Sequence, residues 1–246
     1  MSAGASASPD GALAALREQY LRLLQRLEAN EREFRRLGRA VWNVQEDERR
    51  RLARELHDGI GQNLTALKHR LVQLEDELPA AQRDRLRAAI ELCGDTLEDT
   101  REMSRLLRPP VLDDLGLGPA LRWLARSMGE AAGIEVELEI DELPALDGDL
   151  QTLLFRVAQE ALNNIAKHAQ ARHVLVRVVA RGGSLQLQVA DDGRGCDPEA
   201  AFRSGGSGLG GMRERLGLYE GRLELHSAAG EGARLRATVP LVPPPA

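Results

Sequence analysis

Apolar residues recur every three or four positions through the first part of the chain, which is the spacing of a helix that buries one face. The seam residues are Leu13, Leu16, Tyr20, Leu23, Leu27, Asn30, Phe34, Leu37, Val41 and Val44. A heptad repeat of this length predicts a coiled coil, and the single Asn in the seam is typical of one that fixes register. We therefore expect a parallel two-stranded coiled coil over residues 12–47. The alternative is a long helix packed on its own domain.

A second apolar seam follows and predicts an amphipathic helix around a histidine. Its members are Leu52, Leu56, Ile60, Leu64, Leu67 and Leu71. His57 lies one residue past a seam position, about 100° around the helix, so it is expected to point outward. Asp58 follows it, and Gln62 lies on nearly the same face. Gly59 and Gly61 each cost a helix roughly 1 kcal/mol relative to Ala, which favours the close approach of another group to this backbone.

The spacing changes between the two seams, because Val44 and Leu52 are eight residues apart rather than seven. Such a stutter locally unwinds a coiled coil. A change of twist upstream is therefore expected to rotate the helix face that carries His57. A lone histidine on a charged helix is more often simply solvated, so the role of His57 depends on the rest of the chain.

The first helix is expected to end near Leu78, and a second to run from about Ala81 to Arg108, before two prolines. The seam of this second helix consists of Leu86, Ile90, Cys93, Leu97, Thr100, Ser104 and Leu107. Two helices joined by a short turn form a hairpin, and two hairpins in a dimer form a four-helix bundle. Residues 48–110 are thus predicted to be an all-α dimerisation domain.

After the prolines, helical and strand patterns predict an α+β domain with a mostly antiparallel sheet over residues 111–242. A turn is expected first, followed by a helix from about Pro119 to Ala131. Strands are expected at residues 134–140, 174–180, 185–190, 222–227 and 233–240. Two more helices are expected, at residues 149–169 and from 208 to about 219, with a Gly-rich loop at residues 192–208. Residues 1–11 and 243–246 are expected to be tails.

Composition narrows the class of protein. Hydrophobic residues make up 43% of the 246-residue chain and aromatic residues only 3%, so the core must consist mainly of Leu, Val and Ala. The net charge of -5 gives no basic surface for nucleic acid. Cys93 and Cys196 have no metal or redox spacing. No apolar run reaches the roughly 18 to 20 residues of a membrane span, so a cytoplasmic protein is expected.

Polar residues on one helix of the second half suit phosphate chemistry. Glu160 and Asn164 lie four residues apart on one face, and Lys167 and His168 follow one turn later. A carboxylate, an amide and an ammonium group together suit a hydrated Mg²⁺ and the phosphates that it bridges. Helices often carry such residues as a solvated face, so this feature is weak by itself.

Two glycine-rich segments add further candidates. Asp191 directly follows an apolar strand and can accept a hydrogen bond from an exocyclic amine, while Gly193 and Gly195 let a flat ring lie close. The second segment opens a helix, whose N–H groups form an anion site; its candidate residues are Gly206, Gly208, Leu209 and Gly210. It has neither the Lys of a Walker A loop nor a surrounding parallel βαβ unit. Each segment alone also fits an ordinary loop.

Taken together, the motifs resemble the sensor histidine kinases of the nitrate-sensor and desaturase-thermosensor branch. The matching segments are RLARELHDGIGQ, LLRPPVLDDLGLGPAL, QEALNNIAKHA, DDGRG and GLGGMRERL. The second half also resembles the α+β sandwich that gyrase-type ATPases and Hsp90 use to bind ATP. The resemblance covers about residues 46–241, and the coiled coil matches only in kind.

The resemblance implies an ATP-dependent protein-histidine kinase that works as a homodimer with ATP and Mg²⁺. His57 would accept the phosphoryl group at Nε2, and Asp58 would orient and deprotonate the imidazole. The phosphoryl group would then pass to an aspartate of a response regulator. Gln62 would position a water molecule that removes phosphate from this regulator.

The resemblance also implies roles in nucleotide binding. Asn164 would hold Mg²⁺ beside Glu160, and Lys167 and His168 would lie near the phosphates. Asp191 would bind the adenine amine. The residues implied to line the adenine pocket or to form the base of the lid are Gly193, Gly195, Gly206, Gly208, Leu209 and Gly210.

Some features depart from the family. Ala233 stands where a Thr is often found near the adenine, so either a water replaces the hydroxyl or nucleotide affinity is lower. No sensor domain is recognised before the coiled coil, so we expect either that the coiled coil or a partner protein senses the input, or that a sensor was lost or cut away. Two other classes remain open: a coiled-coil adaptor that binds nucleotide without phosphoryl transfer, and a serine kinase of the anti-sigma type. The intact histidine helix argues against the second, because such a kinase needs no acceptor histidine.

Overall fold

The computed structural model describes residues 9–203 and 207–241 and divides into two compact units between Trp42 and Asn43. The first unit is the N-terminal part of helix α1 (Pro9–Arg54). Residues 9–11, expected to belong to a tail, are helical in the structure. The predicted seam is exposed in the single chain, and the Phe34 side chain is 73% exposed. An uncovered apolar stripe of this kind favours association with another helix, and the coiled coil stays a prediction.

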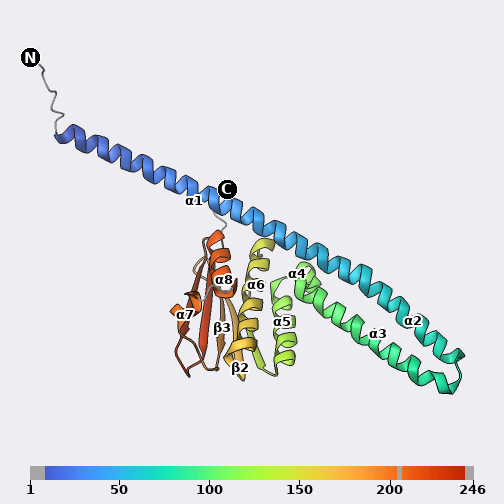
Figure 1. Ribbon diagram of the computed structural model, residues 1–246. Coiled ribbons are helices and arrows are strands. Elements are labelled where there is room, and N and C mark those ends of the chain that lie inside the picture. The colour runs from blue at the N-terminus through green and yellow to red at the C-terminus, as the bar shows by residue number, and fades with distance from the viewer. Residues whose placement is uncertain (1–8, 204–206, 242–246) are drawn as a thin grey trace, which may run out of the picture. The chain divides into compact units, whose positions relative to one another are not determined.

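The second unit opens with a helical hairpin (Figure 1). From α1 the chain continues through η1 (Glu55–Gly61) into α2 (Gln62–Glu77) and returns along α3 (Ala80–Leu107). The turn is short because Leu78 and Pro79 are extended, and Gln82 N–H donates to the Pro79 carbonyl at 2.9 Å. At the end of the hairpin opposite the turn, the Ser104 hydroxyl donates to the Ala53 carbonyl at 2.8 Å. The predicted hairpin is confirmed.

The expectation of one continuous α-helix through His57 was wrong, because η1 is a π-helix. A π turn holds more residues than an α turn, so the rotation of 100° per residue does not apply across this segment. Gly59 and Gly61 lie within it. Without a Cβ atom they adapt to the wider turn with little steric cost. Short π segments inside α-helices occur frequently at functional sites.

The α+β domain follows the hairpin, and its predicted elements are present with small shifts in their ends. In chain order they are α4 (Pro110–Leu115), α5 (Leu117–Ala132), β1 (Glu135–Ile140), α6 (Gly148–Asn164), η2 (Ile165–Ala169), β2 (His173–Arg181), β3 (Ser184–Asp191), α7 (Pro198–Arg203), α8 (Ser207–Leu218), β4 (Arg222–Ser227) and β5 (Ala233–Pro240). Helix α4 replaces an expected turn, and α7 lies within the expected loop. Both are too short to show a helical period. The end of the expected 149–169 helix is the π-helix η2.

The sheet has the order β1-β2-β3-β5-β4, with β1 parallel to β2 and all other pairs antiparallel. This arrangement confirms the mostly antiparallel sheet. Helices α5, α6 and α8 pack on one face (Figure 1). The core between these layers holds fully buried residues of α6 and the central strands, including Leu153, Leu154, Phe155, Val157, Val178, Leu185 and Leu187. The register sets Asp191, at the end of β3, opposite Ala233, at the start of β5.

Candidate active site

His57 lies on η1 with its side chain exposed. Among the described residues, none forms a hydrogen bond or ion pair with the His57 ring or with the neighbouring Asp58 carboxylate. The elements that pack against η1 are α2 and α3. No atom lies within 4 Å of a Cβ placed on Gly59, so the backbone beside the ring is open. The imidazole is therefore free to meet a reacting group from outside the hairpin.

Gln62 begins α2, and its side chain is exposed. Its backbone N–H donates to the Gly59 carbonyl, so the end of the π-helix fixes its position. The sequence analysis placed Gln62 on nearly the same helix face as Asp58, assuming α-helical spacing. Because Asp58 lies in the π-helix η1, that spacing does not apply between the two residues. Its exposure leaves the amide available to water.

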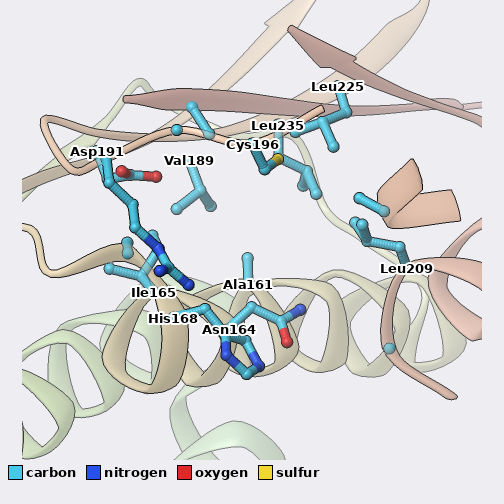
Figure 2. A pocket seen from close by; sticks show the side chains of 16 residues that line it. Ala161, Asn164, Ile165, His168, Val189, Asp191, Cys196, Leu209, Leu225 and Leu235 are labelled. Atoms are coloured by element: carbon cyan, nitrogen blue, oxygen red, sulfur yellow. The ribbon is translucent and has the colours of Figure 1, made fainter. Parts of the chain in front are cut away.

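A cavity of about 330 Å³ lies in the α+β domain between α6 and η2 on one side and β3 and β5 on the other (Figure 2). The sheet contributes an apolar floor that includes Val189 and Leu235. Six of the predicted nucleotide-site residues line this cavity, namely Asn164, His168, Asp191, Gly195, Gly208 and Leu209. Residues from three separate motifs of the sequence thus meet in one concave site of a size that suits a small molecule.

The Asp191 carboxylate lies at the sheet edge of the cavity (Figure 2). Burial raises its pKa above the ordinary value, while hydrogen bonds from the backbone N–H groups of Gly193 and Ala233 act in the opposite direction. The Gly193 bond is 2.9 Å long. The carboxylate is thus held in place and half-buried, and it can accept a hydrogen bond from an amine that enters the cavity.

The glycines that follow Asp191 are required by close backbone contacts. A Cβ on Gly193 would lie 2.3 Å from the Ala169 carbonyl oxygen, and one on Gly195 would lie 1.9 Å from the Ala228 carbonyl oxygen. Gly195 also has a φ of 66°, which disfavours other residues. Gly195 lines the cavity and Gly193 does not. Their main effect is to let the loop pack tightly and keep Asp191 in place.

Glu160, Asn164 and Gly208 meet at the other end of the cavity. A Cβ on Gly208 would lie 2.6 Å from Glu160 Oε1 and 3.5 Å from Asn164 Oδ1. Carboxylate and amide oxygens beside the start of α8 fit a hydrated Mg²⁺ that bridges phosphates. In the described parts of the chain, no group of three or more His, Cys, Asp or Glu residues could hold a metal ion.

The structure does not bring every predicted residue to the cavity. Lys167 is exposed and lies outside its lining, as does Gly210 on α8. Glu160 is absent from the lining, although its carboxylate lies beside Gly208. Gly206 falls outside the described residues. Lys167 follows the change from α- to π-helix at Ile165, which alters the face that each later residue occupies.

Sequence reasoning missed the contribution of Arg194, which lines the cavity. Its N–H donates to the Ala169 carbonyl at 2.8 Å, and its own carbonyl accepts from Gly230 N–H at 2.7 Å. The backbone is therefore fixed on both sides. The position of an arginine between two glycines directly after Asp191 could have drawn attention to it. Cys196, a free cysteine, and Ala233, noted for its missing hydroxyl, also line the cavity.

The segment around His57 and the segment that contains the cavity each match a known protein family. Residues 48–112, which include His57, match the family model described as "Histidine kinase". Residues 149–243, which include the cavity, match the model described as "Histidine kinase-, DNA gyrase B-, and HSP90-like ATPase". The chain belongs to the histidine kinases. The cavity therefore lies within its ATP-binding domain.

Known sensor histidine kinases are similar to this chain over most of its length. It is 38% identical to the sensor histidine kinase MctS of Rhizobium johnstonii over 83% of its own length and 45% of that protein. It is 34% identical to the sensor histidine kinase ComP of Bacillus subtilis over 80% of its own length and 27% of ComP. Identity to the signal transduction histidine-protein kinase/phosphatase DegS of Brevibacillus brevis is 31%, over 85% of this chain and 55% of DegS. The chain thus spans between about a quarter and just over half of these relatives.

A solved structure supports the fold. The histidine kinase domain of the Erythrobacter litoralis EL346 blue-light activated histidine kinase superposes with a TM-score of 0.50 at 18% identity. The superposition covers 73% of this chain and 94% of that domain. None of the helices in the part of the chain that the structure describes combines the length and apolar character that crossing a membrane requires.

Proposed function

We propose that this histidine kinase autophosphorylates His57 from Mg-ATP as a homodimer and passes the phosphoryl group to an aspartate of a response regulator. The observation that carries the proposal is the exposed, unpartnered His57–Asp58 pair in the same chain as an ATP pocket. Dimerisation is supported by the exposed apolar seam of the hairpin, which a second hairpin would cover to form a four-helix bundle.

The residues suggest how the phosphoryl group is transferred. The Nε2 lone pair of neutral His57 attacks the γ-phosphorus; the N–P bond forms as the bond to the ADP oxygen breaks. Asp58 stabilises the positive charge on the ring and accepts a proton from Nδ1. Asn164 would hold Mg²⁺, whose chemistry is to neutralise charge on the phosphates. Backbone N–H groups at the start of α8 add to that neutralisation.

Labelling the full chain with γ-³²P-ATP tests the proposal. We expect a phosphorylated product that is stable in base and labile in acid, with no label in His57→Gln. The matched control is His69→Gln, an exposed histidine on α2, which should label like the wild type. Label that survives His57→Gln would reject the assignment. ATP binding without any label would favour the adaptor interpretation instead.

A phosphatase activity is a finer part of the proposal. It is supported by the exposed amide of Gln62 and by the name of the Brevibacillus relative, a kinase/phosphatase. We expect Gln62→Ala to retain autophosphorylation and to slow loss of phosphate from a phosphorylated receiver domain about tenfold or more, the scale of a lost water-positioning group. Equal rates of loss with both forms would remove Gln62 from this step.

A further inference from the structure

The cavity of the ATP-binding domain is poor in the positive charges that nucleotide phosphates attract. Among its described lining residues, Arg194 is the only lysine or arginine. Lys167, which the resemblance places near the phosphates, is exposed and lies outside the lining. His168 lines the cavity, but an imidazole is a cation only when it is protonated. Arg194 is therefore the one permanent cation in the described part of the lining.

The backbone of Arg194 holds this residue at the cavity. Its N–H donates to the Ala169 carbonyl at 2.8 Å, and its carbonyl accepts from Gly230 N–H at 2.7 Å. The neighbours Gly193 and Gly195 have no room for a side chain, because a Cβ on them would lie 2.3 Å and 1.9 Å from backbone carbonyl oxygens. The point from which the Arg194 side chain extends is therefore fixed by tight packing on both sides.

The donors of the Arg194 guanidinium are available to a ligand. Within the described residues, this side chain makes no hydrogen bond, ion pair or ring contact. The two carboxylates that precede it in the chain are bonded to other groups. Asp191 accepts from backbone N–H groups. Asp192 Oδ1 accepts from His173 N–H at 2.9 Å, and Asp192 Oδ2 lies 2.7 Å from His173 Nδ1. A guanidinium has five N–H donors, and a planar anion with several oxygens is the partner that they fit.

The place of Arg194 in the cavity favours the phosphates over the base. Its backbone is bonded to Ala169, which directly follows His168 on the helix side of the cavity, where Asn164 also lies (Figure 2). The features that suit a base, the Asp191 carboxylate and the apolar floor, belong to the sheet side. An adenine base carries no charge, whereas phosphates are anions. A charge-assisted hydrogen bond to phosphate is also stronger than the contact of an exposed guanidinium with an aromatic ring.

We propose that Arg194 binds the phosphates of the nucleotide and supplies, inside the cavity, the positive charge that the resemblance assigns to Lys167. The inference rests on the proposed function and names a residue that determines specificity for its nucleotide. Arg194 makes the affinity increase with the number of phosphates, while Asp191 recognises the base. The two residues, three positions apart after β3, divide the recognition of one ligand between them.

The test measures binding of adenosine, ADP and the non-hydrolysable β,γ-imido analogue of ATP to the full chain by calorimetry, with Mg²⁺ present. For Arg194→Ala we expect the affinity for the ATP analogue to fall about thirtyfold and that for adenosine to change by less than about twofold, because only phosphates lose a charge-assisted partner. The matched control is Arg181→Ala, an exposed arginine at the end of β2 outside the cavity lining, which should bind like the wild type. A loss of equal size for all three ligands would assign Arg194 to the base and overturn the proposal, as would no loss for any of them.

Two further variants separate the charge of Arg194 from its packing. Arg194→Lys keeps the positive charge and should recover part of the affinity for the ATP analogue, whereas Arg194→Gln is uncharged and should bind like Arg194→Ala. Added salt should weaken binding of the ATP analogue less in Arg194→Ala than in the wild type, because one screened charge pair is missing. A merely structural role predicts a lower melting temperature and equal affinities of the Lys and Gln variants, and that result would overturn the proposal.

Lys167→Ala compares the two candidate cations directly. We expect this variant to lose at most about threefold in affinity for the ATP analogue, because Lys167 is exposed and its charge is screened by solvent. A larger loss from Lys167→Ala than from Arg194→Ala would overturn the assignment of the phosphate contact to Arg194.

These binding measurements separate this inference from the proposed function, because none of them requires phosphoryl transfer. If no form of the protein labels His57, the proposed function fails, and the order of affinities still decides the role of Arg194. If the wild type labels His57 while Arg194→Ala binds the ATP analogue as tightly as the wild type, only the inference about Arg194 fails.

Discussion

The hairpin and the ATP-binding domain bury their apolar residues in opposite ways. Side chains such as Leu154 and Phe155 in the ATP-binding domain are fully buried within the single chain. In the hairpin, Leu67 is 48% exposed, and Leu52, Ile60, Leu74 and Leu92 are exposed as well. The ATP-binding domain therefore has a complete core, whereas the hairpin leaves part of its apolar seam uncovered in the single chain. Exposed apolar surface on this scale marks a site of association.

The difference places the cavity and His57, the two sites of the proposed reaction, on scaffolds of different kinds. Asp191, Asn164 and Gly208 are positioned by the sheet and the helices that pack on it, so the cavity is formed within the single chain. His57 lies on a π-helical segment of a hairpin whose apolar seam is exposed in the single chain. We therefore expect substitutions in the hairpin to alter assembly and transfer, and substitutions in the ATP-binding domain to alter nucleotide affinity with assembly intact.

The largest expected effect comes from breaking the association of the hairpin. Leu67→Glu would place a carboxylate in the predicted bundle seam, where a buried charge is very costly, and we expect dimer affinity to fall about a thousandfold or more. Nucleotide affinity should change little. Sedimentation equilibrium measures the first property and titration with a fluorescent ATP analogue the second. Leu115→Glu, an exposed apolar position on α4, should remain dimeric. A monomeric wild-type chain would contradict the premise.

A smaller effect is expected from neutralising the half-buried Asp191 carboxylate of the pocket. Asp191→Asn replaces the acceptor for the nucleotide amine by an amide, and we expect ATP affinity to fall about a hundredfold, as for loss of a charge-assisted hydrogen bond. Assembly should be unaffected. Because the folded pKa of Asp191 is raised, the charged form is disfavoured by folding, so the substitution should leave the melting temperature unchanged or higher.

The same residue predicts a pH dependence. The folded carboxylate takes up a proton at a higher pH than an unfolded Asp does. As pH falls through the raised pKa, the contribution of this group to stability increases, while ATP affinity decreases because the acceptor is lost. Calorimetric titration of ATP at several pH values checks the trend. Asp191→Asn should show a flatter profile, and an equally steep profile in this variant would assign the dependence to another group.

The smallest expected effect distinguishes two glycines of α8. A Cβ on Gly208 would press against Glu160 Oε1 at 2.6 Å, whereas a Cβ on Gly210 would have no neighbour within 4 Å. We expect Gly208→Ala to weaken Mg-ATP binding about tenfold, because Glu160 and Asn164 must shift. Gly210→Ala should bind normally and gain up to about 1 kcal/mol of stability from its helical propensity. Equal Mg-ATP binding by the two variants would show that the close contact between Gly208 and Glu160 does not affect binding.

The sequence predicted more of the fold than of the site. Period and turn residues located nearly every long element because each signal is local, and the strands at 222–227 and 233–240 match the structure at both ends. The short helices α4 and α7 escaped because six residues show no period. The π-helices were not predicted because the spacing of apolar residues carries no information about the hydrogen-bond pattern of the backbone. Lys167 lies outside the cavity, beyond the start of one of these segments.

By itself the sequence determined the family, the histidine that faces solvent and the order of the nucleotide motifs, because each is written in residues that are close together in the chain. Only the tertiary structure decided that Arg194 lines the pocket, that Gly193 is required by the Ala169 carbonyl, and that Glu46 meets Arg156. The last two residues are 110 positions apart. Their pairing follows from how helices pack, and no local period of hydrophobic residues encodes it.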